Sequence, residues 1–244
     1  MGFDNDVMFV NQNGAAIYMY DFGHRTSLDW TDTALSKLFS LTKNSKSVKI
    51  EDFGVMGAGE DTLVTLSSKC WLCAWKVDRA QKSKSLLDKV SLNQTEGALE
   101  SGCSLAVVPK TNLVVVHLTS KIQKGRQPPK SYASSFALYE LLRDRFVRKG
   151  FIDFSDRGSA PVGTLAFSSK IGEDLFFAGV TRRPPYTLYT IRYNLADEKL
   201  DVVDSITKKL EGNMKILRFT LYDGELWGVN SDFMRVCIEH RLTY

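Results

Sequence analysis

The chain has 244 residues, of which 43% are hydrophobic and 25% are charged, and its formal net charge is +4 at pH 7. This composition is typical of a folded globular protein and excludes a chain that is disordered throughout. No apolar run is long enough to span a membrane, and the N-terminus lacks the pattern of a secretory signal, so we expect no membrane partner. Four scattered cysteines are too few for a disulfide framework, which favours a reducing compartment, cytoplasmic or nuclear.

The first half of the chain predicts short β-strands, because apolar and polar residues alternate in segments rich in β-branched and aromatic residues. In chain order these strands are 7–14, 15–21, 27–30, 51–56, 62–69, 70–78 and 86–92. Residues 31–49 interrupt the series with apolar residues close to helical spacing, and they predict a short helix in a long connection.

The second half continues the same rhythm. Its predicted strands are 103–108, 113–121, 135–141, 146–154, 164–167, 174–180, 187–193, 200–206, 216–221, 226–232 and 233–240. Large aromatic residues stand at equivalent places in four of the hairpins, at Tyr20, Trp75, Tyr139 and Tyr193. A recurring unit of four strands favours a repeat architecture, and a non-repetitive β-sandwich is the alternative.

The sequence CWLCAWKVD, residues 70–78, resembles the strand that ends in a Trp-Asp pair in the WD40-like β-propeller superfamily, with Trp75 in the Trp position and Lys76 in place of Asp. The sequence TLAFSSK, from Thr164, is similar to the first strand and turn of the family's repeat. The resemblance covers nearly the whole chain. It implies an all-β propeller of about five four-stranded blades in a single domain, 1–244, and a role in binding and scaffolding. The approximate blades are 1–30, 48–92, 101–154, 161–206 and 214–244.

The two ends of this repeat are expected to be incomplete. No strand is predicted before residues 7–14 or after residues 233–240. We therefore expect a propeller that is incomplete or closed by a partner strand. The strand 233–240 would present an unpaired edge, and such an edge invites a strand-donating partner.

Two further patterns in the sequence suggest metal or acid-base chemistry, but each has a plainer interpretation. Cys70 and Cys73 have the spacing of a metal or redox pair, yet residues three apart on a strand point to opposite faces, so we expect buried structural thiols. His117 lies among apolar residues and is expected in the core.

Three acidic pairs are expected to be solvated turn residues, since exposure is the default state of carboxylates. They are Glu51-Asp52, Glu60-Asp61 and Glu173-Asp174. The sequence contains no nucleophile or phosphate-binding motif. We therefore predict no catalytic residue, no metal site and no cofactor, and a protein that is not an enzyme.

Charge distribution carries more information than any motif. The loops predicted to emerge on one face of the propeller hold an excess of Lys and Arg, which predicts a basic face. Two of these loops contain Pro-Pro pairs, in the sequences KGRQPPK and TRRPPY. The predicted binding residues in and beside them are Lys121, Lys124, Arg126, Lys130, Tyr132, Arg182, Arg183 and Tyr186.

Three functions are compatible with these patterns. The first is a non-catalytic scaffold or adaptor that binds protein partners within a multi-subunit complex, with an acidic protein surface meeting the basic loops. The second is an accessory subunit associated with RNA or DNA, in which the basic face contacts phosphates and Tyr132 and Tyr186 stack on bases. The third and least favoured is a propeller enzyme with a site in its central channel, because the expected channel strands carry few titratable groups.

Overall fold

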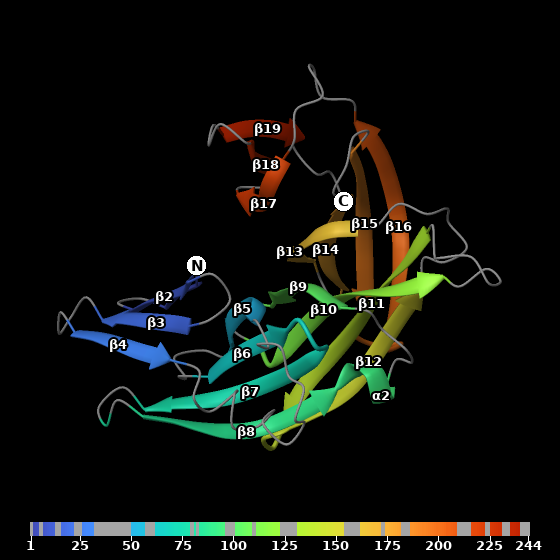
Figure 1. Cartoon of the computed structure of the whole chain (residues 1–244). Coiled ribbons are helices and arrows are strands. Elements are labelled where there is room, and N and C mark those ends of the chain that lie inside the picture. The colour runs from blue at the N-terminus through green and yellow to red at the C-terminus, as the bar shows by residue number, and fades with distance from the viewer. Residues whose placement is uncertain are drawn as a thin grey trace. The chain divides into compact units, whose positions relative to one another are not determined.

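The computed structural model consists almost entirely of short antiparallel β-strands (Figure 1). It describes residues 2–4, 7–12, 16–21, 26–31, 50–56, 62–78, 81, 83–95, 101–108, 111–122, 131–153, 162–171, 174–181, 186–208, 216–222, 225–230 and 235–239. Within these ranges no helix is long and apolar enough to cross a membrane. The chain divides into two compact units: Met1–Val114 with Glu140–Val147, and Val115–Tyr139 with Arg148–Tyr244.

The first unit begins with a four-stranded sheet in simple sequential order, β1-β2-β3-β4. Its strands are β1 (Gly2–Asp4), β2 (Val7–Gln12), β3 (Ala16–Asp21) and β4 (Thr26–Thr31). The expectation that no strand precedes residues 7–14 is wrong, because β1 pairs with β2, with Phe3 opposite Met8. Three residues are too short to display the alternation from which a strand is predicted.

The second sheet also belongs to the first unit and has the order β5-β6-β7-β8. Its strands are β5 (Ile50–Met56), β6 (Thr62–Ser67), β7 (Trp71–Asp78) and β8 (Ser83–Ser91), and the one-turn helix α2 (Leu92–Thr95) follows. Every residue of β6 is buried. A strand covered on both faces in this way forms the centre of the core.

The third sheet has the order β12-β11-β10-β9, and the division between the two units runs through it. Its strands are β9 (Ser101–Val107), β10 (Leu113–Ile122), β11 (Ser131–Leu142) and β12 (Arg145–Asp153). β10 is buried continuously from Leu113 to Leu118.

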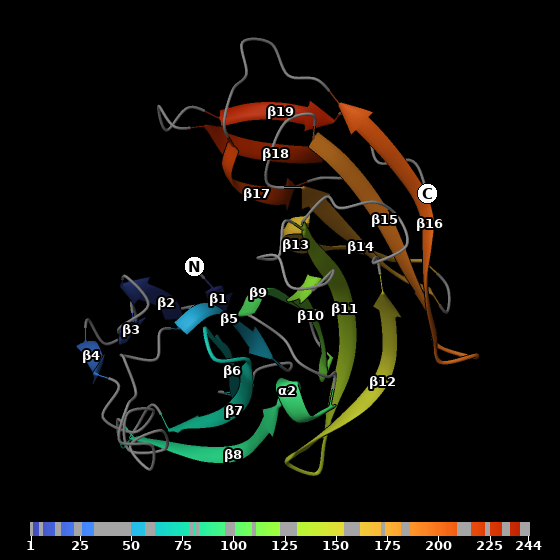
Figure 2. The ribbon, with the colours of Figure 1, turned by 45° about the vertical axis from the view of Figure 1, so that its right-hand side comes forward.

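The second unit contains a fourth sheet, in the order β13-β14-β15-β16, and a fifth, in the order β17-β18-β19 (Figure 2). The strands are β13 (Val162–Ile171), β14 (Asp174–Thr181), β15 (Tyr186–Asn194), β16 (Lys199–Lys208), β17 (Ile216–Tyr222), β18 (Glu225–Asn230) and β19 (Arg235–Glu239). Among the described residues, the fifth sheet therefore has three strands where each of the others has four.

The first strands of consecutive sheets lie side by side within each unit. In the first unit β1 contacts β5 and β5 contacts β9, and in the second unit β13 contacts β17. Sequential four-stranded sheets that meet through their first strands are the arrangement of propeller blades. The five repeats predicted from the sequence correspond to these five sheets, whereas the single domain 1–244 remains a prediction.

The hairpin aromatics occupy the core as their equivalent positions imply. Trp75, Tyr139 and Tyr193 are 4%, 1% and 2% exposed. Of residues 31–49, the structure describes Thr31, which ends β4. The helix expected in this range therefore lies outside the described residues.

Candidate functional site

The position that resembles the family's Trp is fixed by a buried side-chain hydrogen bond. Trp75 Nε1 donates to Thr65 Oγ1 across the β6–β7 hairpin at 3.0 Å. Lys84 Nζ lies 5.3 Å from the centre of the Trp75 ring, so a cation covers the indole from β8. Lys76, which replaces the family's Asp, is exposed. Trp75 is thus a structural residue that joins three strands of one sheet.

The cysteine pair is buried, but not for the reason that the sequence suggested. Cys70 precedes β7 and lies in a turn with φ of 60°, where its N–H donates to Ser67 O at 3.0 Å. The prediction that both cysteines sit on one strand is therefore wrong. Cys70 and Cys73 are each 1% exposed and form no disulfide. Across the described part of the chain, no three His, Cys, Asp or Glu side chains are grouped to hold a metal ion.

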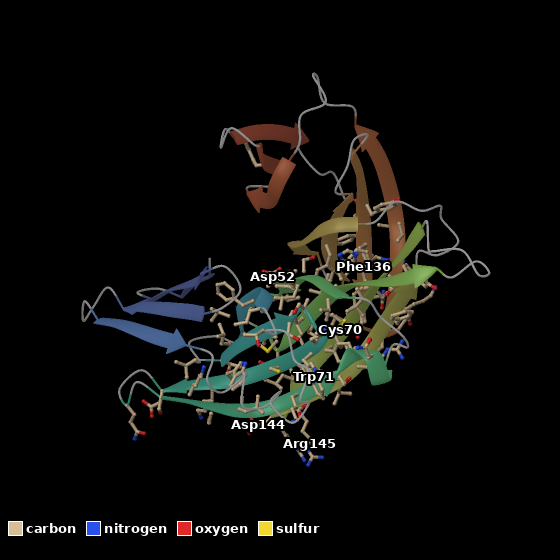
Figure 3. All side chains as sticks on the ribbon, viewed as in Figure 1. Asp52, Cys70, Trp71, Phe136, Asp144 and Arg145 are labelled. Carbon is tan, nitrogen blue, oxygen red and sulfur yellow. The ribbon has the colours of Figure 1, made fainter. Side chains whose placement is uncertain are left out.

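Asp52 departs from the expectation of a solvated turn residue, because it lies inside β5 and is half-buried. Its Oδ2 accepts a hydrogen bond from the backbone N–H of Leu105 in β9 at 2.9 Å, and its Oδ1 accepts one from Phe53 at 3.0 Å. Figure 3 shows Asp52 beside the start of the third sheet. This carboxylate therefore ties the second sheet to the third.

Asp88 makes a second tie of the same kind, which the sequence did not suggest. Its Oδ2 accepts a hydrogen bond from the backbone N–H of Phe146 in β12 at 2.7 Å. The strand register places Gly54, Val64, Ala74 and Asp88 in one row across the second sheet, so these side chains share a face. That face is turned toward the third sheet.

The other predicted acidic pairs and the core histidine can be placed in part. Asp174 begins β14 and is half-buried, rather than lying in a turn, whereas Glu173 and Glu60-Asp61 fall outside the described residues. His117 is fully buried in β10, and its ring lies 5.2 Å from that of Phe136 in β11. The prediction of a core histidine is confirmed.

The predicted basic binding residues lie on two hairpins of the second unit. Lys121 belongs to β10 and Tyr132 to β11, while Tyr186 is the first residue of β15. Five residues of the set lie outside the described residues: Lys124, Arg126, Lys130, Arg182 and Arg183. Both loops join the second and third strands of their sheets, so they are topologically equivalent. The binding role of all eight residues remains a prediction.

Two solved structures with similar folds are β-propeller domains. The chain resembles the β-propeller domain of Nup133 from Vanderwaltozyma polyspora, with a TM-score of 0.63, 9% identity, and coverage of 95% of this chain and 70% of that one. It also resembles the β-propeller domain of Cps50 (Swd1) from Myceliophteria thermophila, with a TM-score of 0.60, 10% identity, and coverage of 96% and 66%. No protein-family model and no curated protein matches the sequence.

These likenesses establish the fold. The chain has the fold of a β-propeller. Identities of about a tenth say nothing of function, since one fold serves many functions. The chain also spans only about two thirds of the length of these two propeller domains.

Proposed function

We propose that the chain is a non-catalytic scaffold that holds protein partners within a multi-subunit complex. The observation that carries the proposal is the fifth sheet, in which β19 pairs with β18 and, among the described residues, has no neighbour on its other side. An edge strand of this kind offers a row of backbone donors and acceptors to an added strand. A partner that donates one strand would bring the fifth sheet to four strands, the number in each of the other sheets.

The strand addition is tested by hydrogen-deuterium exchange of the 244-residue chain, before and after binding of a partner captured by affinity purification and identified by mass spectrometry. A donated strand hydrogen-bonds to the outer edge of β19, so exchange of the amides of Arg235–Glu239 should slow. Slowed exchange at β19 supports the proposal. Unchanged exchange at β19 in a saturated complex contradicts it.

The basic hairpin loops are proposed as a second binding surface of the scaffold, facing an acidic protein surface. Support comes from the equivalent placement of the two loops in their sheets and from the Pro-Pro pair in each. Proline restricts the unbound loop and lowers the conformational entropy lost on binding. Such a surface requires neither a cofactor nor a catalytic group.

Charge reversal tests this surface. The triple variant Arg126→Glu, Arg182→Glu and Arg183→Glu should bind the captured partner about tenfold or more weakly at low salt, because the electrostatic attraction is inverted. Lys76→Glu with Lys89→Glu is a control at exposed positions within β7 and β8, outside the loops that join second and third strands, and partner binding should be retained there. Equal affinity of the triple variant and the parent chain would refute the surface.

The second candidate is an accessory subunit that binds RNA or DNA in the cytoplasm or the nucleus. Tyr132 and Tyr186 favour it, since aromatic residues at the bases of basic loops are suited to stacking on unpaired bases. Binding of a poly-uridine RNA with a steep salt dependence, lost in the triple variant, would favour this candidate over the protein scaffold. Absence of binding to poly-uridine RNA and to duplex DNA at low salt would eliminate it.

A further inference from the structure

The tip of the β11–β12 hairpin exposes apolar side chains. Leu142 is 41% and Val147 is 42% exposed. Within the described ranges, Val203 is the one other large hydrophobic residue that is exposed to this degree. Two such residues within six positions of one hairpin form an apolar feature, because most other large hydrophobic residues that the structure describes are buried or half-buried.

The turn fixes how these side chains are arranged. Arg143 and Asp144 have φ angles of 47° and 64°, so both central residues of the turn are left-handed, as in a type I′ hairpin. A two-residue turn of this type places Leu142 directly opposite Arg145. Strand alternation then puts Val147 on the same face as Arg145. Leu142, Arg145 and Val147 therefore share one face of the tip.

The stem beneath this face is held rigidly. Leu141 is buried, and its N–H donates to Asn112 O at 2.8 Å. The Phe146 N–H is bonded to Asp88 Oδ2 at 2.7 Å, so it is not available to an added strand. The tip is consequently preorganised, and recognition there must use side chains rather than β-strand pairing at this point of the edge.

The charges around the apolar residues indicate what the tip can bind. Arg143 and Arg145 are exposed, and neither forms an ion pair with any residue that the structure describes. Figure 3 shows the Arg145 side chain extending away from the ribbon, next to Asp144. Guanidinium groups bind carboxylates through two parallel hydrogen bonds, and arginine beside exposed apolar residues is typical of protein interfaces.

We propose that the hairpin tip Leu142–Val147 docks a segment of a partner protein in which carboxylates flank an apolar side chain. The apolar side chain packs on Leu142 and Val147, and the carboxylates pair with Arg143 and Arg145. Nucleic acid fits this tip less well, because Asp144 stands between the two arginines and phosphates gain nothing from the apolar face. The site adds a contact to the proposed scaffold and is independent of the basic loops.

The probe is a fluorescein-labelled nonapeptide with two leucines, each flanked by aspartates, and its binding to the whole chain is followed by fluorescence anisotropy. We expect saturable binding that the same peptide with asparagine in place of aspartate does not show. Arg143→Glu with Arg145→Glu should weaken binding at least tenfold, and Leu142→Ser with Val147→Thr about fivefold, because the affected side chains supply the two halves of the site.

Matched variants make the result specific. Lys69→Glu with Lys76→Glu changes the net charge by the same amount at other exposed positions, and it should leave peptide affinity within twofold of the parent. The basic-loop triple variant should also retain affinity, so failure at the tip and failure of the proposed basic surface are distinguishable. Circular dichroism establishes that each variant is folded.

Three outcomes would overturn the docking site. The first is equal loss of affinity in the Lys69 and Lys76 control, which would show attraction to net charge alone. The second is poly-uridine RNA binding that depends on Arg143 and Arg145 while the peptide does not bind. The third is self-association, measured by sedimentation velocity, that Leu142→Ser with Val147→Thr abolishes, which would show that the tip meets a second copy of the chain.

Discussion

Two contacts between neighbouring sheets, one in each unit, are stabilised by different kinds of interaction. In the first unit the second sheet reaches the third through carboxylates that accept backbone N–H groups, at Asp52 and Asp88. In the second unit β12 contacts the fourth sheet through the ion pair of Lys149 with Glu198, whose side chains are 19% and 57% exposed. A half-buried carboxylate that satisfies a backbone donor contributes more to stability than an exposed ion pair.

The two contacts also differ in how tightly a glycine is packed against the neighbouring sheet. A Cβ at Gly54 would lie 2.5 Å from Val107 Cγ2, closer than real atoms approach. A Cβ at Gly150 would lie 3.2 Å from Leu200 Cβ, which is tight but can be relieved by a small shift. The second and third sheets therefore approach so closely at Gly54 that no side chain fits between them there.

Alanine at Gly54 gives the largest expected effect. Gly54→Ala should lower the free energy of unfolding by about 2–3 kcal/mol, because the overpacked methyl must displace a branched side chain. Gly150→Ala should cost about 1 kcal/mol or less, since a shift of a few tenths of an ångström suffices. Urea unfolding followed by circular dichroism compares them. Equal losses in the two variants would show that the contacts are equally tight and would break the comparison.

Removal of the carboxylates gives the next effect. Asp52→Ala leaves the N–H groups of Leu105 and Phe53 without this acceptor, and Leu105 is buried, so we expect a loss of about 2 kcal/mol. Asp88→Ala should cost about 1 kcal/mol, because Phe146 is half-buried and water can replace the carboxylate. Asp52→Asn retains an acceptor oxygen and is the control, with a smaller loss than alanine. A loss below about 0.5 kcal/mol for Asp52→Ala would remove Asp52 as a tie between sheets.

The strands could be predicted from the sequence because their signal is local. Alternation within β7, for example, needs only the residues of that strand, and the hydrogen bond of Trp75 to Thr65 joins residues ten apart in one hairpin. The three-residue β1 carries too little pattern and was missed. Cys70 was misplaced because nothing in its immediate sequence demands a left-handed residue before β7.

The ties between sheets could not be predicted for the opposite reason. Asp52 stands beside Glu51 and has the appearance of a solvated acidic pair, while its acceptor role depends on Leu105, 53 residues further along the chain. Gly54 lies within the predicted strand 51–56, where nothing in the local sequence requires a glycine, and its need for space is set by Val107 on another sheet. The candidate docking tip was missed as well, since the exposure of Leu142 and Val147 depends on which other elements cover the hairpin, and the local sequence does not show this.

The smallest expected effects distinguish the stability contributed by the Lys149–Glu198 ion pair from the cost of the backbone conformation at Glu198. Glu198 has a φ of 51°, a left-handed conformation that costs a residue with a Cβ about 1 kcal/mol relative to glycine. Lys149→Met keeps the apolar stem and should cost at most about 0.5 kcal/mol, a difference that vanishes in 1 M salt as screening removes the attraction.

Glu198→Gly loses the same ion pair yet relieves the backbone, so its free energy of unfolding should equal or slightly exceed that of the parent chain. Glu198→Gln, which keeps the strained backbone and loses only the charge, should fall slightly below the parent chain, as Lys149→Met does. The order Gly above Gln at position 198, measured by urea unfolding, would show the backbone strain at this residue. A loss of at most about 0.5 kcal/mol in Glu198→Gln relative to the parent chain would show that the ion pair contributes little to stability. If instead Glu198→Gln costs as much as Asp52→Ala, the two contacts are equivalent in strength and the distinction between them fails.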